Sequence, residues 1–216
     1  MFLSLLYENE KNELLNGCAA GHTFKKPGAT GITLEYSNMY ARQNTETPRC
    51  HHSQAEHASG LAIVTIGNSL RADDGIASAL CDQLPHETMV DACRFDLGTY
   101  SNYLSECLKG HKAVIIIDST CDGRSPGSIT IVDLNSLLES STLDIKSTHG
   151  FSLLDELKLA KEQDLLPPRL IFFGVEIGEI NWKESISPAL QEKLPQLVKN
   201  LAFLVQKMLE ALRKDA

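Results

Sequence analysis

Three apolar runs, each short and almost unbroken, constrain the fold of this chain more than any other feature. They read LAIVTI (61–66), KAVIIID (112–118) and RLIFFGVEI (169–177). A strand that is apolar at successive positions is typical of a parallel sheet covered on both faces, whereas a strand with one face in water alternates. Helical patterns lie between the runs. The chain therefore predicts repeated strand–helix units around a buried sheet.

Two further strands and four helices complete the predicted domain. The pattern indicates a second strand over 88–95 and a fourth strand over 127–134, so the sheet has five strands. The fourth strand follows the third so closely that a hairpin or tight loop joins them, which permits an antiparallel arrangement. We therefore expect a three-layer α/β/α fold with a mostly parallel, twisted five-stranded sheet. The helices are expected over the segments 75–84, 100–108, 150–163 and 188–214.

The last predicted helix has clear signals at its start. Ser187 is a candidate N-cap and Pro188 is suited to the first helical position. Pro195 is expected to interrupt this helix, because proline lacks the N–H group that an interior helical position donates.

Residues 1–60 differ in composition from residues 61–216, which we interpret as the α/β domain. The first segment is rich in Gly, Thr, Ser and His and lacks sustained apolar periodicity, so a weakly structured extension is predicted. Its cysteines and histidines could be taken for a metal cluster, but no second tight pair of thiols is present, which favours a polar, histidine-rich patch. These residues are Cys18, His22, Cys50, His51, His52 and His57.

Charge and composition exclude several classes of partner. The formal net charge is −8 and no stripe of Lys and Arg is present, so nucleic acid is not expected as a partner. No segment reaches the roughly 18 apolar residues that a membrane-spanning helix needs. The six cysteines lack CxxC spacing and no export signal precedes them, which favours reduced thiols in the cytoplasm.

Polar side chains follow the strands where ligands usually gather in such a sheet. Asp73 and Asp74 come shortly after the first apolar run, Asp118 ends the third strand, and His149 precedes a helix. If the first and third strands are neighbours, these groups converge at one edge. Two carboxylates and an imidazole suit a divalent first-row metal ion such as Ni, Mn or Zn. The adjacent acids repel each other, so a positive group is expected nearby.

Each of these residues also has a purely structural interpretation. Asp73 or Asp74 can cap the helix that begins near Gly75, and for Asp73 this is favoured over metal ligation. Asp118 can accept hydrogen bonds from the amides of the turn that follows it, and His149 can be a polar loop residue.

Other catalytic chemistries receive less support from the sequence. The turn after the first strand has too few glycines for a dinucleotide fingerprint and lacks the lysine of a P-loop. No G-x-S-x-G motif is present. Cys121 could act as a nucleophile beside His149, but no further residue fixes that pairing, so a structural or incidental cysteine is favoured.

Four motifs follow one another along the predicted domain. They are IGNSLRADDGIA, IIIDSTCDGRSPGSI, STHGFSLLDEL and FFGVEIGEINWKESISPAL. In this order they resemble the hydrogenase maturation protease family, the endopeptidases that trim the large subunit of nickel-iron hydrogenases. The resemblance runs from about Leu61 almost to the C-terminus, whereas residues 1–60 match nothing in it.

The resemblance implies a site and a reaction. The residues that correspond to the metal-contacting trio of the family are Asp74, Asp118 and His149, and Asp73 takes the adjacent acidic position. The family often has Glu where this chain has Asp74. The implied activity is a nickel-dependent, cytoplasmic endopeptidase that removes a short C-terminal peptide from the precursor of a hydrogenase large subunit. The nickel is supplied by that precursor rather than tightly held by the enzyme, and it would be the positive group beside the acids.

Two alternatives to this function stay open. One is a germination-type endopeptidase of similar fold, which the nickel-associated motifs disfavour. The other is a nickel-binding maturation chaperone or scaffold, with the histidine-rich extension as the store. Removal of residues 1–60 separates the chaperone from the protease, because a chaperone should lose metal binding whereas a protease should still cut.

Overall fold

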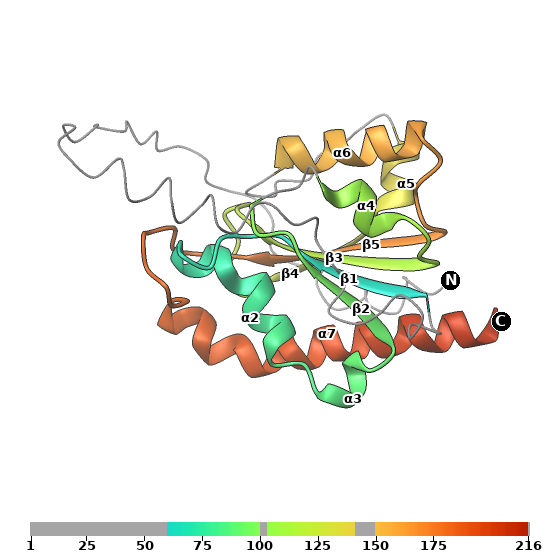
Figure 1. The fold of residues 1–216 in the computed structure, drawn as a ribbon. Coiled ribbons are helices and arrows are strands. Elements are labelled where there is room, and N and C mark those ends of the chain that lie inside the picture. The colour runs from blue at the N-terminus through green and yellow to red at the C-terminus, as the bar shows by residue number, and fades with distance from the viewer. Residues whose placement is uncertain (1–59, 100–102, 141–149, 216) are drawn as a thin grey trace, which may run out of the picture. The chain divides into compact units, whose positions relative to one another are not determined.

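A five-stranded sheet in the order β2-β1-β3-β5-β4 forms the centre of the computed structural model (Figure 1). The structure describes residues 60–99, 103–140 and 150–215. The longest strands are the two that carry the longest apolar runs, β3 and β5, and both are almost completely buried. The strands are β1 (Leu61–Thr65), β2 (Ala92–Asp96), β3 (Ala113–Thr120), β4 (Ile129–Asp133) and β5 (Arg169–Glu176).

The predicted fold class is confirmed. β1 pairs in parallel with β2 and β3, β3 pairs in parallel with β5, and β4 pairs antiparallel with β5. β4 does not form a hairpin with β3, because β5 lies between them and is the strand with which β4 pairs. The apolar side chains of β5 give it two buried faces, which suits an interior position better than the half-buried β4 does.

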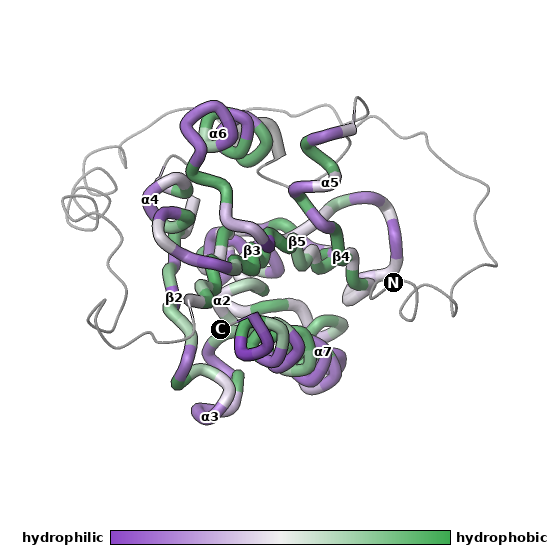
Figure 2. Tube along the Cα trace, turned by 90° about the vertical axis from the view of Figure 1, so that its right-hand side faces the viewer, coloured by the Kyte–Doolittle hydropathy of each residue, from purple (hydrophilic) through white to green (hydrophobic). Residues whose placement is uncertain are grey.

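Helices cover both faces of the sheet (Figure 1). One face packs on α2, α3 and α7, and the other packs on α4, α5 and α6. Figure 2 shows hydrophobic strands between helices in which hydrophobic and hydrophilic residues alternate. The helices are η2 (Ala72–Gly75, a 3-10 helix), α2 (Ile76–Asp82), α3 (His86–Met89), α4 (Leu104–Leu108), α5 (Leu134–Glu139), α6 (Gly150–Glu162) and α7 (Pro188–Lys214).

Two short α-helices, α3 and α5, and the 3-10 helix η2 were not predicted from the sequence. The expected strand 88–95 was wrong in its first half, because Pro85 precedes the helical turn α3 and the strand begins only at Ala92. The helix α5 follows β4 directly, and its N-cap Asp133 accepts a hydrogen bond from the Ser136 N–H at 3.1 Å.

The helix α7 begins and ends as predicted, but the predicted interruption at Pro195 was wrong. The Ser187 hydroxyl accepts a hydrogen bond from the Leu190 N–H, and Pro188 is the first helical residue. Pro195 lies inside this helix and does not end it. Proline has no N–H group, so the carbonyl one turn earlier lacks its helical partner. The Pro195 side chain is exposed, so this carbonyl faces the solvent side. The opposite face of the helix stays buried against the sheet.

The described cysteines only partly follow the expectation of reduced thiols. Cys81, Cys107 and Cys121 are free, whereas Cys93 is in a disulfide bond. The predicted extension over 1–60, with its histidines, lies outside the described residues. In the part of the chain that is described, no helix combines the length and the apolar stretch needed to cross a membrane.

Candidate functional site

Adjacent parallel strands bring two of the predicted site segments together. Thr65 and Ile117 are partners in the register of β1 and β3, and the Ile66 N–H donates to the Ile117 carbonyl at 2.9 Å. The segment that carries Asp74 follows β1, and Asp118 lies within β3 one residue beyond this pair. The condition under which the two carboxylates converge, that the first and third strands are neighbours, is therefore met.

The chain turns sharply at Gly67 to reach η2. Gly67 has φ of +146°, and a Cβ atom there would lie 2.2 Å from the Asp74 carbonyl oxygen, so only glycine allows this close approach. The Asn68 side chain accepts a hydrogen bond from the Leu70 N–H at 3.0 Å, which shapes the turn. Ala72 has φ of 52°, a left-handed conformation that destabilises a residue with a Cβ by about 1–2 kcal/mol. Its N–H donates to the Lys183 carbonyl at 2.7 Å, which helps to hold it there.

Ser119 joins the two predicted carboxylates. Its hydroxyl donates to Asp74 Oδ1 at 2.9 Å, and its backbone N–H donates to Asp118 Oδ1 at 2.7 Å. Asp74 Oδ2 also accepts the Asn68 N–H at 3.2 Å. Asp74 and Asp118 are buried to within a few per cent of their surface. The two acids therefore lie close enough together to accept hydrogen bonds from the same serine residue.

Asp73 is held by different groups and has a structural role. Its Oδ2 accepts hydrogen bonds from the N–H groups of Gly178 and Glu179 and from the Ser187 hydroxyl, at 3.2, 2.9 and 3.0 Å. Its Oδ1 accepts the Ser187 N–H at 2.6 Å. The predicted cap of the following helix was wrong, because α2 has Gly75 at its N-cap position and no side-chain cap. The donors around Asp73 are neutral amides and a hydroxyl rather than a cation.

A further buried carboxylate, Glu176, orders the loop after β3. Its Oε1 accepts the N–H groups of Asp122, Gly123 and Arg124 at 2.7, 2.7 and 3.1 Å. Its Oε2 accepts the Thr120 hydroxyl at 2.8 Å. The amides of the turn after Asp118, which were considered as its structural partners, thus donate mainly to Glu176, and Asp118 Oδ1 accepts the N–H of the adjacent Ser119.

His149 lies outside the described residues, so its predicted place in the site stays a prediction. Within the described ranges no group of three or more His, Cys, Asp or Glu side chains is arranged to hold a metal ion. Asp74 and Asp118 supply oxygen donors that divalent ions accept, and two carboxylates leave room for further ligands from elsewhere. Chemically, the pair can bind a cation or orient a water molecule.

The buried thiols of the described chain are poorly suited to nucleophilic catalysis. Burial raises the pKa of Cys81 to about 12 and that of Cys107 to about 12, which keeps both thiols protonated near neutral pH. Cys121, the cysteine for which a nucleophilic role was considered, is exposed in the loop that Glu176 orders.

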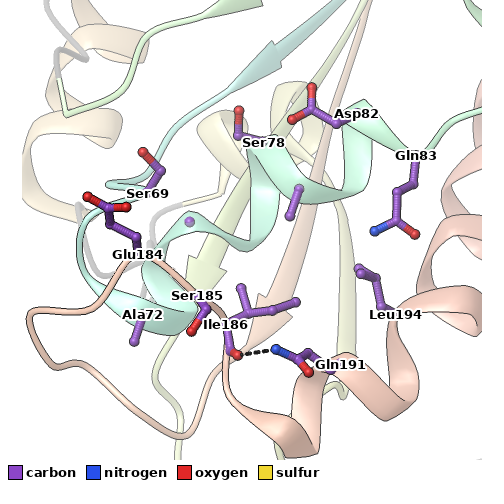
Figure 3. A pocket seen from close by; sticks show the side chains of 12 residues that line it. Ser69, Ala72, Ser78, Asp82, Gln83, Glu184, Ser185, Ile186, Gln191 and Leu194 are labelled. Carbon is purple, nitrogen blue, oxygen red and sulfur yellow. Dashed lines mark hydrogen bonds between the residues drawn. The ribbon is translucent and has the colours of Figure 1, made fainter.

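A shallow groove of about 550 Å³ lies beside the segment that carries the acids (Figure 3). Its walls come from η2 and α2 on one side and from residues 184–186 and the start of α7 on the other. Gln191 spans the start of α7 by donating to the Ile186 carbonyl at 2.8 Å. Neither Asp74 nor Asp118 lines this groove, so it is a neighbour of the carboxylate pair and not its location.

Sequence reasoning assigned no role to Ser119 or Glu176. Ser119 directly follows the predicted ligand Asp118, so its proximity was visible although its partner Asp74, 45 residues earlier, was not. Glu176 is an acid inside an otherwise apolar strand, and a buried acid requires hydrogen-bond donors. An acid in this apolar run was the signal from which a structural role for Glu176 could have been predicted.

Known proteins resemble this chain over the same region. The hydrogenase maturation protease family, HycI, matches residues 80–202, a range that includes Asp118 and His149 and begins after Asp74. The hydrogenase expression/formation protein HoxM of Azotobacter vinelandii is 28% identical over 166 residues, which are 73% of this chain and 78% of HoxM. HupM of Azotobacter chroococcum is 28% identical over 155 residues, which are 68% of this chain and 72% of HupM.

Solved structures share the architecture. The hydrogenase maturating endopeptidase HybD from E. coli superimposes with a TM-score of 0.57 at 19% identity, over 68% of this chain and 92% of HybD. A [NiFe] hydrogenase maturation protease HybD from Thermococcus kodakarensis superimposes with a TM-score of 0.55 at 23% identity. This match covers 67% of this chain and 98% of the Thermococcus protein. The fold is thus that of the maturation endopeptidases. The family match, residues 80–202, spans more than half of this chain, which therefore belongs to the hydrogenase maturation protease family.

Proposed function

We propose that this protease is nickel-dependent and removes a short C-terminal peptide from the precursor of a nickel-iron hydrogenase large subunit. One observation carries the proposal, the hydrogen bonds by which Ser119 joins Asp74 to Asp118 at the carboxyl ends of adjacent strands. The resemblance of both acids to metal-contacting positions of the family supports it. His149 is the third proposed contact.

The carboxylate pair suits a metal ion that arrives with the substrate. Structural metal sites are usually closed by four protein ligands, whereas Asp74 and Asp118 leave most positions to other groups. Nickel held by the precursor would bring positive charge to these acids, and its substrate-borne ligands would complete the coordination. This sharing makes the enzyme sensitive to whether the precursor has received its metal.

The proposed reaction is hydrolysis of one peptide bond. A water oxygen adds to the scissile carbonyl carbon, the C–N bond breaks, and the leaving nitrogen takes up a proton to become an amine. Nickel would polarise the carbonyl or the attacking water. Asp74 and Asp118 would orient the reacting groups around it, with Ser119 holding both acids in place.

The test is incubation of the purified protein with a nickel-loaded large-subunit precursor, followed by mass measurement. We expect the precursor to lose one C-terminal peptide. Asp74→Asn should slow this cleavage at least about a hundredfold. Asp155→Asn is the matched control, because that acid is half exposed on α6 and pairs only loosely with Lys158 at 3.7 Å, and it should cut like the wild type. An intact precursor after incubation with the wild type would refute the proposal.

A further inference from the structure

The loop between β5 and α7, residues 177–187, keeps large apolar side chains in water. Trp182 is 73% exposed and Ile180 is 39% exposed. Trp182 is also the single tryptophan of the chain. Tryptophan is enriched among the residues that dominate protein interfaces, because it buries a large apolar area with few rotatable bonds. Such a side chain in solvent therefore marks a surface for contact.

This loop is firmly attached to the segment that carries Asp74. Asp73 accepts four hydrogen bonds from its two ends, at residues 178–179 and at Ser187. The backbone adds a parallel bridge, in which the Ala72 N–H donates to the Lys183 carbonyl and the Lys183 N–H donates to the Leu70 carbonyl at 3.0 Å. Displacement of this loop would therefore strain the turn before Asp74.

The same attachment orients the tryptophan. The Arg71 guanidinium lies 6.0 Å from the centroid of the Trp182 ring, within the range of a cation–π contact. Arg71 is also bonded directly to Asp74, because the Asp74 N–H donates to the Arg71 carbonyl at 3.2 Å. The groove beside η2 is lined by Ser69 and Ala72 and by Glu184 from the loop, so it lies between η2 and the part of the loop that follows Trp182 (Figure 3).

We propose that the loop 177–187 is a docking surface for the folded protein substrate, with Trp182 as its principal contact and Asp73 as the residue that positions it. The inference rests on the proposed function. A stable protein contact buries about 800 Å² on each partner, a patch with a radius of about 16 Å. A contact of this size around the acids is wide enough to reach the Trp182 ring, because that ring lies 6.0 Å from the guanidinium of Arg71 and the Arg71 carbonyl accepts the Asp74 N–H.

Steady-state kinetics on the nickel-loaded precursor tests the contact. Trp182→Ala should raise KM about tenfold to a hundredfold and change kcat less than about threefold, and Trp182→Phe should recover part of the loss. Phe203→Ala is the matched control, because Phe203 is also an exposed aromatic residue, on α7, with the Lys207 ammonium 5.4 Å from its ring. It should leave both constants unchanged.

The outcomes separate the docking surface from the reaction. If the wild type cleaves and Trp182→Ala has an unchanged KM, the docking surface is refuted and the proposed function stands. A lower kcat at constant KM would also refute it, because the tryptophan would then act on the chemical step. If the wild type leaves the precursor intact, the proposed function fails, and with it the inference.

The single tryptophan allows a direct binding measurement. Enzyme labelled with 5-fluorotryptophan and carrying Asp118→Asn, to prevent turnover, has one fluorine resonance, that of Trp182. The nickel-loaded precursor should shift or broaden it. An unchanged resonance at saturating precursor would refute the contact, as would a shift that depends on enzyme concentration alone, which would assign the surface to a second copy of this chain.

The positioning role of Asp73 is tested by a double variant. Asp73→Asn should raise KM as Trp182→Ala does, since the loop loses part of its attachment. The combination Asp73→Asn/Trp182→Ala should raise KM little more than either change alone, because both act on one contact. Fully multiplicative effects would show that Asp73 acts elsewhere and would refute its positioning role.

Discussion

Replacement by asparagine should change the stability of the protein much more at Asp73 than at the adjacent Asp74. Asp73 Oδ1 faces the Ser187 N–H, and Oδ2 faces two further N–H groups and a hydroxyl. An asparagine has only one oxygen, so its NH₂ group must point at a backbone N–H in either orientation. An unsatisfied donor destabilises by about 1–3 kcal/mol, and the remaining bonds lose their charge. Asp73→Asn should therefore lower the free energy of unfolding by about 2–4 kcal/mol.

Asp74 has partners that tolerate the amide. An asparagine oxygen can accept the Asn68 N–H in place of Oδ2, and its NH₂ group can donate to the Ser119 hydroxyl oxygen, which is also an acceptor. Asp74→Asn should therefore change the free energy of unfolding by less than about 1 kcal/mol, while cleavage of the precursor is lost.

Urea denaturation followed by circular dichroism measures both changes. Asp155→Asn serves again as the control, because its half-exposed carboxylate contributes little. The slope of the free energy against urea should be the same for all variants, since the surface exposed on unfolding is unchanged. Equal loss of stability in Asp73→Asn and Asp74→Asn would refute the assignment of one acid to structure and the other to the reaction.

Three further predictions concern the backbone and the thiols. Gly67→Ala should destabilise by at least about 3 kcal/mol in urea denaturation, whereas Gly110→Ala, with φ of +78° and open space, should lose about 1 kcal/mol. Thiols in the unfolded chain ionise above pH 9, whereas burial keeps Cys81 and Cys107 neutral up to a pKa of about 12. The free energy of unfolding should therefore fall by about 1.4 kcal/mol per thiol at pH 10. A variant with alanine at both positions should show a shallower decline with pH. Cys121→Ser should cleave the precursor at the wild-type rate, and loss of cleavage in a folded variant would restore the thiol mechanism.

The parallel core was predictable because its signal is local. Buried parallel strands are apolar at successive positions, and helices of period 3.6 separate them, so the sequence alone indicated the layers. The pairing of β4 with β5 was not predictable, since the sequence shows only that β4 follows β3 closely. Contacts between strands distant in the chain decide that order.

The site was predictable where an acid closes an apolar run. Asp118 was predicted because it closes the strongest apolar run. It lies close to Asp74 because β1 pairs with β3. The role of Asp73 depends on donors 105 to 114 residues later in the chain, and that of Glu176 on donors 52 to 56 residues earlier. No periodicity in a single sequence records such contacts.

Comparison of nickel-free and nickel-loaded precursor tests the central claim most directly. The wild-type protein is incubated with each form of the same precursor, and the released C-terminal peptide is quantified by mass spectrometry. Because the proposed site of Asp74 and Asp118 would leave most of a metal's coordination to the substrate, we predict cleavage of the loaded form and an intact nickel-free form. Equal cleavage of both forms would contradict the proposal that this protease reads the metal in its substrate.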